Sequence, residues 1–472
     1  MVNWLIGGYY DLIPNSQSPI PNHQLMTKIN VNNINHGNPG PAGWNVVLAE
    51  PAPARLLDKQ ITADFLVIGG GFTGLAAARR LSQNEPEAKI VLVDAIRIGD
   101  GSAGRSSGFM IDLPHDLNSN SYTGASEEDI RQTAMLRTAV SFAAEAAEEY
   151  EFPKETFDLR GKVYAAATPS GDKHNHEYAE HLIAMGEKPI AFSAAEMQKM
   201  TGTDYYTSGL FTAGTAMIQP AGYVRGIAKG LADKVDIYEN SPVLSLEKKG
   251  KNWLVKTPKG SVSVSKIILA VNGHMQSFGF MKGRLMHIFL YASMTRPLTP
   301  AELSRLGGDA QWDLVPADQM GSTVRKFKAP DGVRIVVRNR FKFSSKLEAS
   351  EQSVQSVIRD HDNSFRARFP MLPDVTMEHR WGGRLCLSWN GVQVFGELED
   401  GLYAATVQNG LGASKGTLSG ILAADYASGR DNEYITDYLN FGPPPRIPPE
   451  PIANVGATAF HPFKEWQAGR EL

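Results

Sequence analysis

The chain has 472 residues, a length that suits two or three domains, and 42% of them are hydrophobic, enough for sizeable cores. Its 47 basic and 50 acidic residues leave a net charge of -3, so no strongly basic field invites nucleic acid or an anionic membrane surface. One cysteine, Cys386, excludes an intrachain disulfide. No apolar run approaches the roughly 18 residues that span a bilayer, and residues 1–10 lack the basic start of a signal peptide. We therefore expect a cytoplasmic protein with no membrane span and no nucleic-acid partner.

Residues 1–60 show no clear hydrophobic periodicity. Asparagine and proline recur there, and both favour turns and extended chain over packed structure. Trp44 is an exception, because a large aromatic side chain can anchor such a segment to a surface. We expect an N-terminal arm over residues 1–60 that packs on the body of the protein, on a neighbouring subunit in a homo-oligomer, or on another protein partner.

Residues 64–94 are typical of a dinucleotide-binding β-α-β unit. A short apolar strand leads into Gly69, Gly71 and Gly74, which open a helix rich in alanine and leucine. These glycines allow a tight turn, a close approach of the backbone to a pyrophosphate, and close packing of the helix on the strand. A second strand ends at Asp94, whose carboxylate can accept hydrogen bonds from an adenosine ribose. The whole unit predicts a dinucleotide site more strongly than the glycines alone.

Two further glycine-rich stretches follow. Residues 99–108 contain four glycines in ten residues, which suits backbone that passes close to a ligand. Residues 408–420 follow a strand at residues 402–407 and open a helix that runs to about residue 427. The free N–H groups at the start of this second helix can also face a cofactor.

The other segments alternate between helices and strands. We expect helices at residues 126–150, 173–185 and 350–369, and strands at residues 161–168, 262–270, 286–296 and 333–343. Arg334, Val336, Arg338 and Arg340 alternate along the last of these strands, so they should share one side of a sheet. The proline-rich tail after Phe441 should be extended. No group of metal-ligand side chains is complete, so we expect no metal site.

The order of the three glycine stretches resembles that of the D-amino-acid oxidase superfamily of FAD enzymes, over about residues 44–430. The amine-oxidising branch, with glycine and sarcosine oxidases and gamma-glutamylputrescine oxidase, is the most similar. Residues 101–108 resemble the branch's Gly-Ala-Ser-Gly-Arg-Asn-Gly-Gly loop, with serines in place of Asn-Gly. Residues 380–396 are similar to its Trp-x-Gly strand, with Gln393 where proline is usual. Residues 403–412 resemble its turn over the flavin, without a histidine that is often present there.

This resemblance implies an α/β fold of the glutathione-reductase-2-like type, in which a Rossmann-like FAD-binding domain is interleaved with an antiparallel β-sheet substrate domain. The implied FAD-binding segments are residues 61–112, 210–285 and 378–430. The substrate domain would take residues 113–209 and 286–377. A proline-rich C-terminal tail would then cover residues 431–472.

The resemblance also implies FAD as the cofactor, bound without a covalent link. Some relatives attach flavin through a cysteine on a comparable strand, but Cys386 lies about three positions from that point. The residues expected to hold FAD are Gly69, Gly71, Phe72, Thr73, Gly74, Asp94, Ala95, Gly104, Arg105, Ser106, Ser107, Gly108, Val243, Ala270, Asn272, Gly382, Gly383, Asn409, Gly410, Leu411, Gly412, Ala413 and Ser414.

The implied activity is oxidation of the C–N bond of an amine or amino acid to an imine, by hydride transfer to flavin N5, with O2 as the acceptor and H2O2 as the product. Three alternatives stay open. The first is a dehydrogenase that passes electrons to a quinone or a carrier. The second is a flavoprotein partner that acts on another polypeptide, and the third is a nicotinamide-dependent enzyme. The identity of the small-molecule amine is beyond the sequence.

Substrate-side residues are less well defined. An arginine is the natural partner of a substrate carboxylate, and Arg338, Arg340 and Arg380 are candidates. His287 is a candidate base, and Lys342 is a candidate cation near the flavin during reaction with oxygen. Aromatic side chains on the same strands can cage an alkylammonium group. Each of these residues also suits an ordinary structural role.

Overall fold

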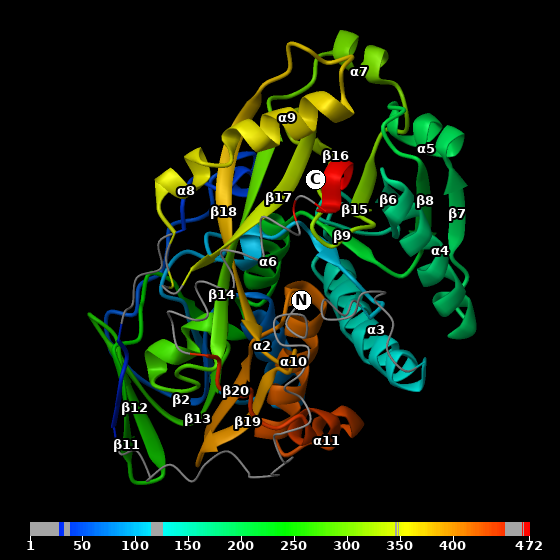
Figure 1. The fold of residues 1–472 in the computed structure, drawn as a ribbon. Coiled ribbons are helices and arrows are strands. Elements are labelled where there is room, and N and C mark those ends of the chain that lie inside the picture. Colours follow the sequence, from blue (N-terminus) through cyan, green and yellow to red (C-terminus); the bar gives the residue numbers. More distant parts are fainter. Residues whose placement is uncertain are drawn as a thin grey trace.

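The computed structural model describes residues 28–32, 38–114, 126–344, 347, 349–448, 465 and 467–472. The described residues form two large β-sheets, one in the lower half and one in the upper half of Figure 1, with helices packed on them. A third, small sheet is formed by β4 (Phe109–Met110), β9 (Ala216–Ile218) and β5 (Phe157–Leu159).

The first sheet has nine strands around a parallel core. The core order is β10 (Val235–Tyr238), β3 (Ile90–Val93), β2 (Gln60–Ile68), β13 (Ser261–Leu269) and β20 (Leu402–Thr406), and each neighbouring pair is parallel. The antiparallel members are β1 (Lys28–Asn30), β11 (Ser245–Lys249), β12 (Asn252–Lys256) and β19 (Val394–Glu399). Because the core strands are parallel, their carboxyl ends meet at one edge, where open α/β sheets bind ligands.

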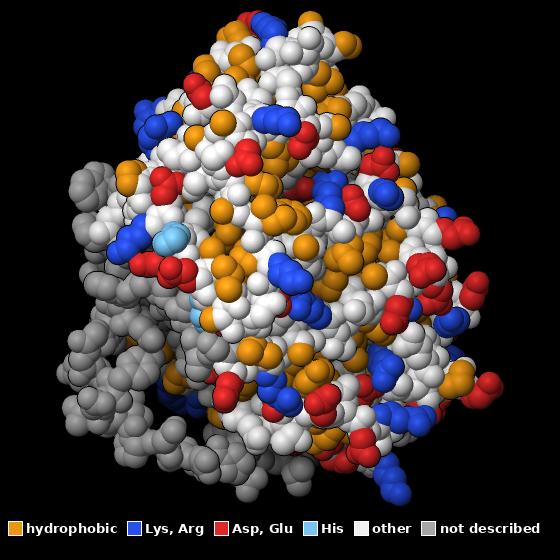
Figure 2. All heavy atoms as spheres, turned by 90° about the vertical axis from the view of Figure 1, so that its right-hand side faces the viewer, with side chains coloured by type: hydrophobic (Ala, Val, Ile, Leu, Met, Phe, Trp, Pro, Cys, Tyr) orange, Lys and Arg blue, Asp and Glu red, His pale blue; other side chains and the backbone are white. Residues whose placement is uncertain are grey.

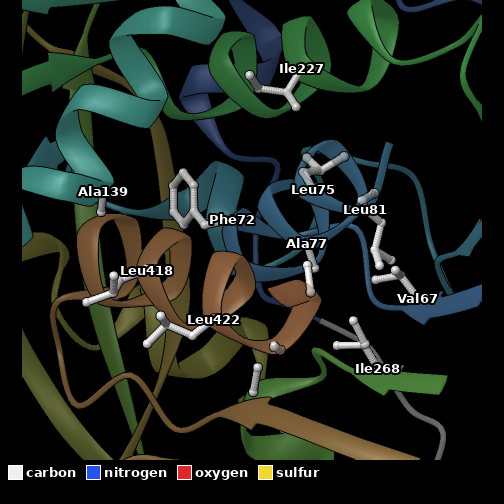
Figure 3. Close-up of a cluster of buried hydrophobic side chains, with 14 of the residues drawn as sticks. Val67, Phe72, Leu75, Ala77, Leu81, Ala139, Ile227, Ile268, Leu418 and Leu422 are labelled. Atoms are coloured by element: carbon white, nitrogen blue, oxygen red, sulfur yellow. The ribbon is translucent and has the colours of Figure 1, made fainter. Parts of the chain in front are cut away.

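Two helices pack on this parallel core. They are α2 (Phe72–Asn84) and α10 (Gly412–Ala427), with α3 (Ser126–Glu149) and α6 (Pro220–Gly230) around them. Figure 3 shows side chains of both helices in one cluster with Val67 of β2, Ile268 of β13, Ala139 of α3 and Ile227 of α6. The two helices approach closely, since a Cβ on Gly420 would lie 2.3 Å from the Thr73 carbonyl oxygen.

The second sheet has eight strands. Their order is β18 (Met377–Ser388), β14 (Leu285–Thr295), β17 (Gly332–Ser344), β16 (Thr323–Ala329), β15 (Trp312–Pro316), β6 (Lys162–Ala166), β8 (Ser208–Thr212) and β7 (Ile190–Ser193). All pairs are antiparallel except β15 with β6. The helices along this half are α4 (Pro169–Ala184), α5 (Ala194–Thr201), α7 (Pro300–Leu306), α8 (Glu351–Gln355) and α9 (Ile358–Arg368).

Short helical segments complete the described residues. They are α1 (Gly43–Val46), η2 (Ala103–Arg105), η3 (Asn272–Phe278), α11 (Glu433–Asn440) and η4 (Gly469–Glu471). Trp44 of α1 is fully buried against Phe327 and Trp381, so it anchors the part of the N-terminal arm that the structure describes. Residues 1–27 and 33–37 of the expected arm over residues 1–60 lie outside the described residues, and the expectation that the arm contacts a partner stays a prediction.

The predicted helices and strands agree with this fold in kind, with two differences. The helix expected at residues 350–369 is divided into α8 and α9 at Ser356 and Val357. The strand expected at residues 333–343 is present as β17, but it contains a β-bulge at Arg340. The expected domain boundaries stay a prediction, and β18, which falls in an expected FAD-binding segment, is hydrogen-bonded in the second sheet.

The surface agrees with the nearly balanced charge. On the face drawn in Figure 2, acidic and basic side chains are interspersed between apolar ones. Within the described ranges, no helix is both long and apolar enough to cross a membrane.

Candidate functional site

A cleft of about 260 Å³ lies at the carboxyl ends of β2, β3 and β13. Its lining joins the three glycine stretches of the sequence, from residues 69–73, 99–106 and 408–412. The edge of the second sheet adds Arg384, Leu385 and Cys386 of β18. The cleft therefore lies between the two sheets, beside the loops that follow the carboxyl ends of the parallel strands.

The N-termini of two helices face this cleft. Phe72 and Thr73 at the start of α2, and Gly412 at the start of α10, belong to the lining. Neither N-cap residue, Gly71 or Leu411, provides a side-chain cap. The N–H groups and the positive dipole ends of α2 and α10 are therefore available for an anionic or electron-rich group.

Asp94 lies at the end of β3, beside the start of α2. Its Oδ2 accepts a hydrogen bond from the Gly70 N–H at 2.6 Å, and its Oδ1 accepts one from the Ile96 N–H at 2.9 Å. Burial raises the pKa of Asp94 to about 6, although these backbone donors favour the charged form. A carboxylate has about four lone-pair sites, so Asp94 keeps acceptor capacity for a ribose hydroxyl.

The turn at residues 409–412 is held by the side chain of Asn409. Its Oδ1 accepts a hydrogen bond from the Ser388 N–H at 2.8 Å, and its Nδ2 donates to the carbonyls of Gly391, Val392 and Val407. Asn409 has a φ of 49° and Val407 a φ of 65°, a strained conformation for a β-branched residue. Such strain persists where the surrounding structure over-determines the backbone, as these hydrogen bonds do here.

Gln393 occupies the position where the resemblance led us to expect proline. Its Nε2 donates to Oε1 of Gln408, and Nε2 of Gln408 donates to Ser419 at 3.0 Å and Thr73 at 3.3 Å. Gln408 lines the cleft. A buried hydrogen-bond network therefore connects Gln393, which directly precedes β19, to Thr73 of α2 and Ser419 of α10.

Cys386 lies in the wall of the cleft and is fully buried. Burial raises the pKa of its thiol to about 12. The thiol is therefore protonated at neutral pH and behaves as a small apolar group.

A second cavity of about 150 Å³ adjoins the cleft. The two share Leu385, Asn409 and Gly410 in their linings. Most of the other lining residues are apolar: Phe109, Ile111, Ile288, Leu290, Val315, Pro316, Phe341, Leu387 and Leu411. The other polar lining residues are Ser107, Gln319, Thr323 and Arg338.

Arg338 is the one cation among the described residues of this lining, and its Nη2 donates to Thr323 Oγ1 at 2.7 Å. The β-bulge at Arg340, which has a φ of 52°, interrupts the alternation along β17. As a result Arg338 and Phe341 line the cavity, whereas Arg340 forms ion pairs with Asp360 and Glu465. The expectation that Arg338 and Arg340 share one side of the sheet is wrong for this reason.

The four candidate catalytic residues lie in neither lining. His287 Nε2 is 2.9 Å from Gln276 Oε1, and burial lowers the pKa of His287 to about 4, so it is neutral. Arg380 donates to Ser293 and forms an ion pair with Asp362. The Lys342 ammonium group donates to Ser356 on the exterior. The side chains of His287, Arg340, Lys342 and Arg380 therefore contact other side chains of the protein outside the cleft and the cavity.

Most of the residues expected to hold FAD line the cleft or the cavity. The lining includes Gly69, Gly71, Phe72, Thr73, Asp94, Ala95, Ser106, Ser107, Val243, Ala270, Asn272, Asn409, Gly410, Leu411 and Gly412, but not Gly74, Gly104, Arg105, Gly108, Gly382, Gly383, Ala413 or Ser414. Of the second group, Arg105 donates hydrogen bonds to the carbonyls of Asp100, Pro39 and Gly382. It therefore connects three segments behind the cleft.

Sequence reasoning missed several lining residues. They include Arg97, His274, Phe278, Arg384 and Gln408. Arg384 Nη1 donates a hydrogen bond to His274 Nε2, because a guanidinium group can only donate. The Arg384 cation therefore lies in the cleft wall. Arg384 follows the Trp-Gly-Gly motif directly, and His274 follows Asn272 and Gly273, so proximity to those motifs was the available signal.

Comparisons with known proteins give a consistent result. A family model described as FAD dependent oxidoreductase matches residues 64–426. Gamma-glutamylputrescine oxidoreductase of Escherichia coli is 25% identical over 403 residues, which cover 82% of this chain and 89% of that protein. The probable oxidoreductase OrdL of Haemophilus influenzae is 25% identical over 383 residues, or 78% of this chain and 84% of that protein.

Solved structures agree on the fold. Glycine oxidase from Geobacillus kaustophilus superposes with a TM-score of 0.65 at 14% identity, over 80% of this chain and 98% of that one. L-Amino acid deaminase from Proteus myxofaciens has a TM-score of 0.64 at 16% identity, over 86% and 97% of the two chains. These likenesses confirm the expected α/β fold with two interleaved sheets.

Proposed function

The chain belongs to the family of FAD-dependent oxidoreductases, and we propose that it oxidises the C–N bond of an amino acid or related amine to an imine, with O2 as the acceptor and H2O2 as the product. The observation that carries this proposal is the second cavity, which joins the cleft through Leu385, Asn409 and Gly410. A small molecule in this cavity would lie against whatever occupies that end of the cleft.

The residues of the cleft fit FAD. Two uncapped helix N-termini suit the diphosphate and an electron-rich carbonyl group, and Asp94 suits a ribose. The buried Asn272 Oδ1 and Ser106 Oγ have no hydrogen-bond partner among the described residues, and both residues line the cleft. Buried polar atoms normally have partners, which supports a polar ligand at this place. We expect the cofactor to be non-covalent, because Cys386 is protonated and apolar in character.

The lining of the cavity favours a substrate with one amino group, a carboxylate and an apolar remainder. Arg338 offers a charge-assisted contact for the carboxylate. Among the described residues that line the cavity, none is an aspartate or glutamate that could accept a second ammonium group. This composition supports an aliphatic or aromatic amino acid over a polyamine, whose additional positive charge would meet no carboxylate of the described lining.

Bound FAD supplies the two-electron acceptor for the C–N oxidation. The chain's own contribution is position and polarity. Arg338, held by Thr323, orients the carboxylate. The apolar walls exclude water and disfavour an ammonium ion, so they favour the neutral amine from which oxidation proceeds.

The test is a panel of amino acids, N-methyl amino acids, simple amines and polyamines, assayed for oxygen consumption and peroxide. We expect equal amounts of oxygen consumed and peroxide released, with apolar amino acids the best substrates. Rapid anaerobic bleaching of the flavin followed by slow re-oxidation in air would contradict the role of O2 and indicate a dehydrogenase. Polyamines as the best substrates would contradict the assigned substrate class.

A further inference from the structure

The loop at residues 105–108 separates the cleft from the substrate-side cavity. Ser106 belongs to the lining of the cleft, and Ser107 belongs to the lining of the cavity. Ser106 has a φ of -68° and a ψ of 170°, so the loop is extended here. Any group that spans the boundary between the two spaces passes this backbone.

Three consecutive carbonyl groups of the loop each accept a hydrogen bond from a different distant side chain. Trp381 Nε1 of β18 donates to the Arg105 oxygen at 3.2 Å, and Trp44 Nε1 of α1 donates to the Ser106 oxygen at 2.9 Å. Arg325 Nη1 of β16 donates to the Ser107 oxygen at 2.8 Å. We call Trp44, Trp381 and Arg325 the anchor residues.

The anchor residues form one buried cluster behind the loop. Trp44 and Trp381 are no more than 1% exposed, and their ring centroids are 6.2 Å apart. The Arg325 guanidinium lies 5.2 Å from the ring centroid of Trp44 and forms an ion pair with Asp313 at 2.7 Å. None of the three lines the cleft or the cavity. The loop therefore lies between the anchor cluster and the two spaces.

The planarity of the peptide bond determines in which direction the N–H groups of the loop point, relative to the anchor residues. In a trans peptide the C=O and the following N–H point in opposite directions. Because the Ser106 and Ser107 oxygens point at the anchor residues, the N–H groups of Ser107 and Gly108 point away from them. Neither N–H donates a hydrogen bond among the described residues. Gly108 has a φ of 83°, and a Cβ there would lie 2.0 Å from Arg325 Nη1, so only glycine fits against the anchor.

The family resemblance already implies that this loop contacts the flavin, and we propose that Trp44, Trp381 and Arg325 are positioning residues that fix the Ser107 and Gly108 N–H groups toward bound FAD where the cleft meets the cavity. Fixed donors stabilise negative charge that develops on an electron-rich group, because they need no reorganisation. The pair favours the reduced flavin, which carries more negative charge than the oxidised form. The inference rests on FAD binding in the cleft and is independent of the substrate and of the electron acceptor.

Ser107→Pro tests the donor directly. Proline removes the N–H of this residue, and Ser106 already has the extended backbone that a residue before proline prefers. Ser107 is not among the residues with a positive φ, a conformation that proline cannot adopt. Ser107→Ala is the matched control, because it removes the hydroxyl and keeps the N–H.

The readouts are the dissociation constant of FAD and the midpoint potential of the bound flavin. For Ser107→Pro we expect about tenfold weaker binding of reduced relative to oxidised FAD, which lowers the potential by about 30 mV for a two-electron couple. Ser107→Ala should keep the wild-type potential. Ser107→Pro protein with wild-type FAD affinity and potential would overturn the proposal.

Trp44→Phe tests the anchor, since it removes the indole donor and keeps an aromatic ring. Trp253→Phe is its matched control, because Trp253 is equally buried and its Nε1 donates to the Asp400 oxygen at 3.0 Å in the first sheet. We expect a lower flavin potential and an altered visible absorption band for Trp44→Phe alone. Equal flavin spectra and potentials in the two variants would contradict a positioning role for Trp44. Loss of amine oxidation with normal flavin properties would instead refute the proposed function and leave this inference intact.

Discussion

Replacing Arg338 by methionine removes the cation from the cavity and keeps a side chain of similar length. Arg338 lines a mostly apolar cavity and donates to Thr323, so its guanidinium is held in place. A hydrogen bond to a charged group contributes about 1.5–3 kcal/mol, and about 1.4 kcal/mol corresponds to a factor of ten. We therefore expect kcat/KM for an amino acid to fall roughly 10- to 150-fold.

The informative measurement is a ratio of substrates. kcat/KM is measured for an aliphatic amino acid and for the amine that lacks its carboxylate, in wild type and in Arg338→Met. The amino acid should lose its advantage in the variant, while the amine changes little. Arg340→Met is the control on the same strand, because Arg340 forms ion pairs with Asp360 and Glu465 and does not line the cavity. An unchanged ratio in Arg338→Met would refute the assignment of the carboxylate to Arg338.

Three further predictions concern the helix packing, the cysteine and Asp94. Gly420→Ala should lower the free energy of unfolding, measured by chemical denaturation, by about 1–3 kcal/mol, because the alanine Cβ would overlap the Thr73 carbonyl oxygen. Unaltered or increased stability would show that α2 and α10 can separate at little cost. Cys386 should resist alkylation at pH 8 until the protein is denatured, and the denatured chain should have the mass of the polypeptide alone; a mass increased by one flavin would contradict non-covalent binding. Burial raises the pKa of Asp94 from 3.8 to about 6, so the native state of the FAD-free protein binds the proton more tightly than the unfolded state. The FAD-free wild type should therefore lose stability relative to Asp94→Asn as the pH rises from about 4 to 6, on the order of 3 kcal/mol, and parallel stability curves over this range would contradict the raised pKa.

The sequence alone was sufficient where function depends on local backbone geometry. Gly69, Gly71 and Asp94 lie within one β-α-β unit, so their spacing already predicts a dinucleotide cleft, and all three line the observed one. The α/β fold and the FAD-dependent family followed from the order of three such local stretches. Each stretch is recognisable without knowledge of its neighbours, because a tight turn into a helix needs the same residues in any context.

Only the tertiary structure decided which side chains face the substrate and which support the loop. Alternation along residues 334–340 places Arg338 and Arg340 on one side, but a single bulge divides them between the cavity and an ion-pair network. Trp44, Arg325 and Trp381 converge on three consecutive carbonyls of one loop although they are far apart in the sequence. No periodicity in the sequence encodes such contacts, since they depend on how separate strands and helices pack.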